Sequence, residues 1–291
     1  MLFHSSYTAL LTPFKGNQVD FESFRKLINF QIDNGTHGLV PVGTTGESPT
    51  LSHQEHKKLV EVCIEETNGR VPVIAGAGSN STTEAVDFVK HASDVGADGV
   101  LVVTPYYNKP TQSGLLAHYN ELIKYSTKPI IIYDIPGRSV IQMCDATMAK
   151  LAENDLIIGV KDATADLTRP TRLQNLISDS FIQLSGEDGT ALAYLAAGGH
   201  GCISVTANIA PKLLSEMHNA WKIGDIKKCQ DINKKLMPLH DALFCETSPG
   251  PLKYAASLLG ICSHEARLPI VDIEDSSKKA IMNALKITGL L

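Results

Sequence analysis

The stretches PIIIYDIPGR, residues 129–138, and LIIGVKD, residues 156–162, decide the fold that we expect for this chain of 291 residues. Each begins with a run of apolar residues and ends in polar ones, with Tyr133 in the first and Lys161 in the second. Neither run alternates cleanly between apolar and polar residues, as a half-exposed strand would. The runs therefore indicate parallel strands that are covered on both faces.

Apolar runs of this kind recur along the chain at intervals of roughly 30 residues, each followed by a turn and a helix-length amphipathic segment. Eight are found, at residues 7–11, 38–42, 71–75, 99–103, 129–135, 156–161, 181–184 and 201–205. Ser52 with Glu55, and Ser81 with Glu84, have the spacing of a capping box and predict helix starts.

The eight repeats predict an α/β protein built as a (β/α)8 TIM barrel. No GxGxxG follows the first strand, which disfavours an open doubly wound sheet. After residue 205 the pattern is helical and is interrupted by prolines. We predict a catalytic barrel over residues 1–225 and a C-terminal helical extension over residues 226–291.

The composition excludes several classes of function. With 43% hydrophobic and 20% charged residues the chain is typical of a folded globular protein. A net charge of -5 provides no basic surface for nucleic acid or for an anionic membrane. No apolar run is long enough to span a bilayer, and the sequence does not start with a basic and then apolar leader, so we expect a cytoplasmic protein.

Neither the cysteines nor the histidines suggest a metal or disulfide framework. Six cysteines are scattered without paired spacing, so we expect reduced and mostly buried thiols. His53 and His56 could share one face of a helix, but a zinc site needs at least three protein ligands and no third is evident. We expect no metal.

Polar residues at the predicted strand ends are the candidates for chemistry, because barrels of this kind bind substrates there. Lys161 follows five uncharged residues. An apolar environment disfavours the ammonium form, so Lys161 is a candidate nucleophile toward a carbonyl, with a lysine paired to Asp162 as the alternative. Tyr133 could move protons or could be an ordinary core tyrosine. Arg138 could bind a carboxylate or lie on the surface.

Two loops add weaker indications. The segment GTTGES, residues 43–48, offers glycines, hydroxyls and free amides that could cradle a small anion, although its spacing is not that of a Walker loop. The segment PYYNKP, residues 105–110, places two tyrosines together. Paired aromatic residues on a loop more often serve packing or an interface.

Five motifs occur in order at successive predicted strand ends: GTTGE at 43–47, PYY at 105–107, Tyr133 followed by PGR, GVKD at 159–162 and SGED at 185–188. Together they resemble the class I pyruvate-dependent aldolase and lyase family over essentially the whole chain. Within it they resemble the branch that condenses pyruvate with L-aspartate 4-semialdehyde in the diaminopimelate route of lysine biosynthesis. The resemblance implies a Schiff-base lyase without metal or organic cofactor, assembled as a homotetramer from two dimers.

The resemblance also assigns roles to residues. Lys161 would form the imine with pyruvate, and Tyr133, Thr44 and Tyr107 would form a hydroxyl relay, with Tyr107 contributed across a dimer interface. Thr44 and Thr45 would hold the pyruvate carboxylate. Arg138 would bind the carboxylate of the semialdehyde. The backbones of Gly186 and Ile203 would line the pyruvate pocket.

A second set of polar residues matches the positions that bind L-lysine in the inhibitable members of the family: Ser48, His53, His56, Asn80, Glu84 and Tyr106. A carboxylate such as Glu84 suits the ammonium groups of that ligand. The alternative is a solvated helix face on which Glu84 only caps a helix.

Four positions depart from the family pattern. Asp134 and Ser248 stand where asparagine is common, Ser139 stands where threonine is usual, and Pro49 stands where alanine is often found. Asp134 is the most consequential, because a carboxylate beside Tyr133 could change the proton affinity of the phenol if it turned inward.

Two alternative functions stay open. One is a sibling lyase such as N-acetylneuraminate lyase or a keto-deoxy sugar-acid aldolase, which shares the lysine and the tyrosine but generally lacks an arginine at the position of Arg138. The other is a non-catalytic regulator that keeps the barrel and its pocket, since a fold does not by itself give a function.

Overall fold

The computed structural model describes residues 3–291. These residues form two compact units, one made of residues 3–4 and 72–203 and the other of residues 5–71 and 204–291. Helix α10 (Ile226–Ala242) begins at the residue where we expect the C-terminal extension to start. The boundary at residue 225 stays a prediction.

The first unit is a parallel sheet with helices between its strands. Its strands lie in the order β10-β9-β8-β7-β6-β5, and their bounds are β5 (Ile74–Gly76), β6 (Gly99–Val103), β7 (Ile130–Asp134), β8 (Ile157–Asp162), β9 (Ile182–Ser185) and β10 (Gly201–Ser204). Ile130, Ile131 and Ile132 are fully buried, as expected for a strand that is covered on both faces.

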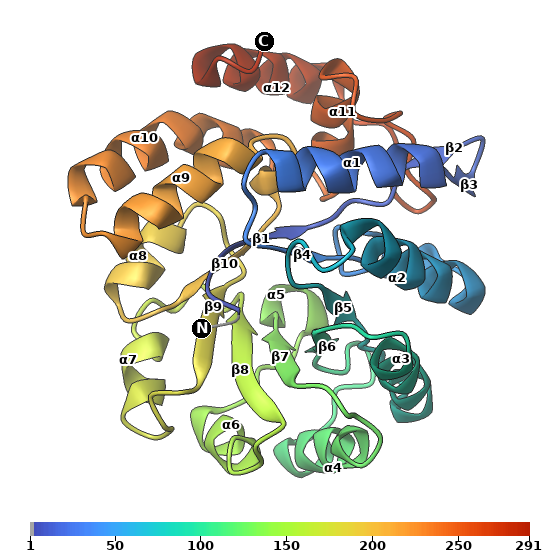
Figure 1. Cartoon of the computed structure of the whole chain (residues 1–291), viewed down its shortest axis with the longest axis vertical. Helices are drawn as coiled ribbons and strands as arrows, with labels where there is room; N and C mark the ends of the chain where they lie inside the picture. Colours follow the sequence, from blue (N-terminus) through green and yellow to red (C-terminus); the bar gives the residue numbers. More distant parts are fainter. Residues whose placement is uncertain (1–2) are drawn as a thin grey trace. The chain divides into compact units, whose positions relative to one another are not determined.

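Helices of this unit flank the sheet (Figure 1). They are α3 (Thr82–Asp94), α4 (Gln112–Ile123), α5 (Pro136–Ser139), α6 (Asp145–Leu151), α7 (Arg169–Gln174) and α8 (Ala191–Ala196). Helix α3 packs on β6 and on α4, while α6 packs on α4 and on α7. These helices connect each strand to the next parallel strand, as βα repeats require.

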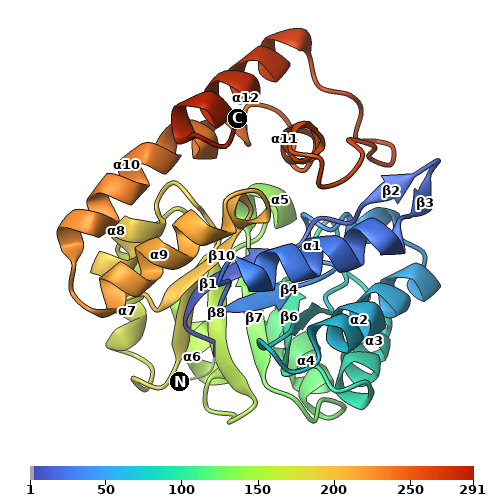
Figure 2. The ribbon, with the colours of Figure 1, turned by 45° about the horizontal axis from the view of Figure 1, so that its top comes forward.

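The second unit joins the first residues of the fold to its last helices. It contains the parallel strands β1 (Ser5–Ala9) and β4 (Gly38–Val40), the hairpin β2 (Phe14–Lys15) and β3 (Gln18–Val19), the short helices η1 (Ser48–Thr50) and η2 (Thr206–Asn208), and the helices α1 (Phe21–Asp33), α2 (His53–Thr67), α9 (Pro211–Lys222), α10, α11 (Gly250–Leu258) and α12 (Asp275–Thr288). Helices α10 and α12 lie side by side (Figure 2).

The strand predictions hold with small shifts. Each of the eight predicted runs overlaps a parallel strand, although the first strand starts two residues before its run, at Ser5, and the third starts at Ile74 rather than at residue 71. The β2–β3 hairpin was not expected, because two-residue strands show no periodic pattern. Ser52 and Glu55 form the predicted capping box. Ser81 caps α3, but the carboxylate of Glu84 accepts a hydrogen bond from Ser79 Oγ at 2.7 Å.

The described residues contain neither a membrane-spanning helix nor a cluster of metal-binding side chains. Among residues 3–291 no helix is both long and apolar enough to cross a membrane, and no three His, Cys, Asp or Glu side chains gather so that they could hold a metal ion. All six cysteines are free, and three of them, Cys63, Cys202 and Cys229, are buried.

A buried ion pair lies inside the second unit. Lys253 on α11 is fully buried, pairs with the carboxylate of Glu47 and donates from Nζ to the backbone oxygen of Glu265 at 2.7 Å. Its Nζ also lies 4.1 Å from the ring centroid of Phe14. Burial lowers the pKa of Lys253, and the carboxylate of Glu47 opposes this shift.

We predict that breaking this pair destabilises the protein more than removing both charges. In Lys253→Met the carboxylate of Glu47 stays buried without its counter-charge, at a cost of about 3 to 5 kcal/mol. The double variant Lys253→Met/Glu47→Gln carries no uncompensated charge and should recover part of the loss. Denaturant unfolding followed by circular dichroism measures both. Equal stability of the single and the double variant would contradict a role for the charge pair.

Candidate active site

Lys161 and Tyr133 lie together at the ends of neighbouring strands. They are register partners in the parallel pair β7–β8, and Lys161 Nζ is 4.1 Å from the centroid of the Tyr133 ring. Each side chain is 5% exposed. A primary amine over the face of a phenol, in a nearly dry position, is suited to attack a carbonyl while the phenol moves protons.

Gly186 leaves room for this amine. Its backbone nitrogen donates to the backbone oxygen of Asp162 at 2.7 Å, which holds the SGED segment against the end of β8. A Cβ at this position would come within 2.8 Å of Ala163 Cβ and 3.3 Å of Lys161 Cε. Any larger residue here would therefore crowd the lysine. Ile203, on β10, is fully buried.

Glu187, in the SGED segment, lies among other charged groups. Burial raises the pKa of Glu187, and Asp188 adds to this shift, while the charges of Lys161 and Arg138 oppose it. Arg138 is exposed on the short helix α5, where its guanidinium can reach a solute. In the sequence, Glu187 is evident only as part of the SGED motif. Its half-buried carboxylate near the lysine is a feature that the sequence could not show.

Asp134 does not turn toward Tyr133. Its side chain is fully buried and accepts from Arg169 Nη1 at 2.8 Å and from the backbone nitrogen of Met143 at 3.2 Å. The possible effect on Tyr133 that we inferred from the sequence required an inward carboxylate. The structure instead satisfies this carboxylate on the opposite face of the strand, so the condition for that effect is not met.

The GTTGE loop belongs to the second unit and is held tightly. Gly46 and Ser48 donate their backbone nitrogens to the oxygen of Gly43 at 3.1 and 3.3 Å, and Thr12 Oγ1 donates to the oxygen of Gly46 at 2.7 Å. Glu47 adopts a positive φ of 56°. In this loop Thr45 is buried and Thr44 is half-buried, so the hydroxyls expected to bind a carboxylate stand on a fixed backbone.

Arg267 fixes the far side of the same loop. Its backbone nitrogen donates to Glu47 Oε2 at 2.9 Å, and its guanidinium donates to the oxygen of Thr50 at 2.9 Å and to Glu55 Oε1 at 2.6 Å. These hydrogen bonds lower the pKa of Glu55 to about 2. Arg267 and Lys253 were missed by the sequence analysis, because each lies more than 200 residues from the loop that it supports.

Three of the residues expected to bind lysine come together in the first unit. The backbone oxygen of Asn80 accepts from Asn108 Nδ2 at 2.8 Å, and Glu84 begins α3 nearby. Burial raises the pKa of Tyr106, and the carboxylate of Glu84 adds to the shift, while hydrogen bonds with Asn80 and Ser79 oppose it.

Tyr107 and the three other residues expected to bind lysine differ in their exposure. Tyr107 is 87% exposed and has a φ of 71°. Ser48, His53 and His56 belong to the second unit, in η1 and the first turn of α2. His56 is buried and His53 is exposed, so the two imidazoles occupy different environments although they are three residues apart.

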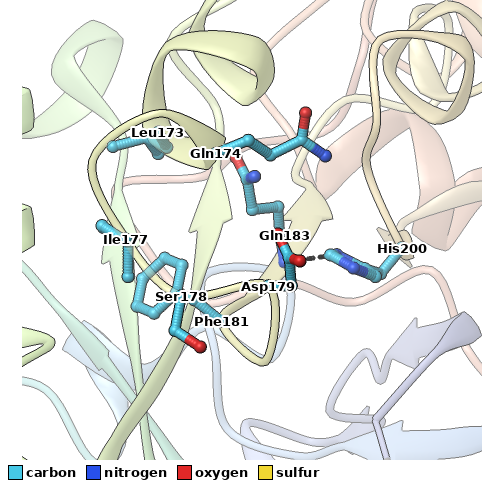
Figure 3. A pocket seen from close by; sticks show the side chains of 8 residues that line it. All are labelled: Leu173, Gln174, Ile177, Ser178, Asp179, Phe181, Gln183 and His200. Carbon is cyan, nitrogen blue, oxygen red and sulfur yellow. Dashed lines mark hydrogen bonds between the residues drawn. The ribbon is translucent and has the colours of Figure 1, made fainter.

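A pocket lies where β9 begins, away from the lysine at the end of β8 (Figure 3). His200 lines it and accepts from the backbone nitrogen of Gln183 at 3.0 Å through Nδ1, and burial lowers the pKa of His200. The buried Oε1 of Gln183 has no hydrogen-bond partner in the structure, which a bound water would supply. No lysine lines this pocket, so an imine with a carbonyl substrate cannot form there.

Comparisons with known proteins identify the family of the chain. The model of the dihydrodipicolinate synthetase family matches residues 2–288. The 4-hydroxy-tetrahydrodipicolinate synthase of Acidiphilium cryptum is 57% identical over 291 residues and covers 100% of both chains. A crystal structure of a dihydrodipicolinate synthase superposes with a TM-score of 0.97 at 46% identity, covering 99% of this chain and 100% of that one.

Two further structures contain small molecules. The chloride-inhibited enzyme of Acinetobacter baumannii, in complex with pyruvate, has a TM-score of 0.96 at 40% identity and covers 100% of both chains. The enzyme of Cyanidioschyzon merolae with lysine bound has a TM-score of 0.96 at 37% identity and covers 99% of both chains. Agreement at this level over the whole length confirms the predicted (β/α)8 barrel. With Lys161 and Tyr133 placed as described, the chain belongs to the dihydrodipicolinate synthetase family.

Proposed function

We propose that the chain is a 4-hydroxy-tetrahydrodipicolinate synthase that condenses pyruvate with L-aspartate 4-semialdehyde through a Schiff base on Lys161, in the diaminopimelate route of lysine biosynthesis. The observation that carries the proposal is the buried Nζ of Lys161, 4.1 Å from the ring centroid of Tyr133. The full-length identity to synthases of this name supports it.

The chemistry follows from the two groups. The neutral amine of Lys161 attacks the keto carbon of pyruvate and forms a carbinolamine, which takes up one proton and loses water to leave a protonated imine. This cation withdraws electrons, so a methyl proton is lost and an enamine forms, which attacks the aldehyde carbon of the second substrate. Each step moves a proton, and we assign this transfer to Tyr133, whose ring centroid lies 4.1 Å from the nitrogen. Release from Lys161 requires an amine or water to attack the imine carbon.

The other roles extend this proposal to binding. We assign the pyruvate carboxylate to Thr44 and Thr45, and the lining of the pyruvate pocket to the backbones of Gly186 and Ile203. Arg138 is assigned the carboxylate of the semialdehyde. Its exposed guanidinium is suited to meet a second substrate that arrives after the imine has formed.

Borohydride trapping tests the covalent step. With pyruvate present, reduction should fix a pyruvate adduct on the peptide that contains Lys161, because only an imine is reduced to a stable amine. Lys161→Met is the negative control. Peptide mass spectrometry that finds the adduct on another lysine, or on none, would overturn the mechanism.

Arg138→Ala serves as a matched variant in the same experiment. It should still trap pyruvate, whereas condensation, coupled to reduction of the product, should fall by roughly 30-fold for a lost contact worth about 2 kcal/mol. Equal loss in both assays would argue against the assigned role. Efficient cleavage of sialic acid by the unchanged protein would favour a sibling lyase.

Tyr107 is proposed to act in the site of a partner subunit of a dimer, and dimers to pair into a homotetramer. An aromatic side chain that is 87% exposed suits a place in an assembly better than one in a free chain. A Tyr107→Phe chain mixed with a Lys161→Met chain should therefore regain activity in mixed dimers. Mixed dimers without activity would show that each chain uses its own tyrosine. The cytoplasmic location also stays a prediction.

L-Lysine is proposed to inhibit the enzyme through the set Ser48, His53, His56, Asn80, Glu84 and Tyr106. Tyr106 lies next to Tyr107, so an occupied site could disturb the relay. Millimolar L-lysine should lower the initial rate, and Glu84→Ala should weaken this inhibition by at least tenfold, because it removes the carboxylate that would meet an ammonium group. Glu121→Ala, which removes a half-exposed carboxylate on α4, is the control. Inhibition that survives Glu84→Ala would place the site elsewhere.

A further inference from the structure

Arg169, the first residue of α7, is a fully buried cation on the face of the sheet opposite to the active lysine. Its Nη1 lies 2.8 Å from Asp134 Oδ2 and 3.7 Å from Asp162 Oδ1. Its other nitrogens donate to the backbone oxygen of Met143 at 2.7 Å and to Asp145 Oδ1 at 3.0 Å. One guanidinium therefore joins the ends of β7 and β8 to the segment that begins α6.

The two carboxylates are tied to the reacting residues by the strand geometry. Asp134 follows Tyr133 and Asp162 follows Lys161, and both pairs are in register in β7–β8. Successive side chains of a strand point to opposite faces, so the phenol and the amine meet on one face while the two carboxylates meet on the other.

Two carboxylates opposite each other on adjacent strands repel, and burial strengthens the repulsion. Burial lowers the pKa of the Arg169 guanidinium, but the charges of Asp134 and Asp162 raise it by more, so that the net shift is upward. Burial also raises the pKa of Asp134, and Arg169 counteracts this shift. The arginine is the cation that lets both carboxylates stay in the sheet.

We propose that Arg169 is a positioning residue of the reaction: it keeps the ends of β7 and β8 in register, so that Tyr133 faces Lys161, and it limits the negative charge behind the amine. The proposal rests on the function assigned above to Lys161. The charge of Asp134, Asp162 and Arg169 sums to -1. Removal of Arg169 makes it -2, and removal of the charge of Asp134 makes it 0.

These sums predict opposite shifts in reactivity. Additional negative charge stabilises the ammonium form of Lys161, so Arg169→Met should raise the pH of half-maximal imine formation by about one unit. Asp134→Asn should lower it by a similar amount. The double variant Arg169→Met/Asp134→Asn restores the sum of -1 and should return the midpoint close to that of the unchanged protein. A purely structural role of Arg169 would not predict this return.

The other groups that face the lysine stay the same in all variants. Within this unit they are Tyr133 on β7, Arg138 on α5, Glu187 and Asp188 after β9, and Cys202 on β10. Arg169→Lys keeps the charge but cannot bond to Asp134, Met143 and Asp145 together. It should keep the pH midpoint and lower the temperature of unfolding.

The experiment measures each variant in two ways across pH: trapping of pyruvate by borohydride, and acetylation of Lys161 by acetic anhydride, read by peptide mass spectrometry. Acetylation needs no pyruvate, so it reports on the amine even if the unchanged protein forms no imine and the proposed function fails. Thermal unfolding identifies variants that do not fold. If Arg169→Met does not fold, the shift in Asp134→Asn decides the question. An acetylation midpoint that stays the same in every folded variant would overturn the proposal.

Discussion

The register of β7 against β8 is the constraint on which the chemistry of the first unit depends. In this register Tyr133 and Lys161 are opposite each other, and so are Asp134 and Asp162. A slip by one residue would send the amine to the face that holds Arg169 and would expose the carboxylates to the substrate side. Apolar packing of Ile130–Ile132 stabilises both strands but does not distinguish one register from another as sharply as a buried charge does.

In the second unit, a buried ion pair holds a loop in one conformation. Its GTTGE loop carries the hydroxyls to which we assign the carboxylate of pyruvate, yet a loop with two glycines would ordinarily be mobile. Glu47 ends this loop in the left-handed conformation, and its carboxylate is held by Lys253 and by the backbone nitrogen of Arg267. If the carboxylate of Glu47 moved out of this position, the buried ammonium group of Lys253 would lose its counter-charge, which is energetically costly. The C-terminal segment thus supports the loop as well as adding helices to the fold.

The residues that could be predicted from the sequence are those with a local pattern. Eight strands were found because runs of β-branched residues repeat, and Lys161 stood out because a charge follows five uncharged residues. The assignment of Thr44, Tyr107 and Arg138 needed the order of five motifs and the resemblance to a family. The hairpin of residues 14–19 was missed because two-residue strands leave no periodicity.

The residues that escaped prediction have partners that are distant in the chain. Arg169 lies 35 residues from Asp134, and Lys253 lies about 200 residues from Glu47, so no spacing rule joins them. Asp134 illustrates the consequence. From the sequence, its carboxylate could only be judged against its neighbour Tyr133, and the inferred effect was on the phenol. The structure shows that alternation along β7 turns the carboxylate away and that an arginine on α7, the helix after β8, neutralises it. A charge introduced beside a reacting group therefore acts through the counter-charge that the fold provides, and only the three-dimensional arrangement identifies that counter-charge.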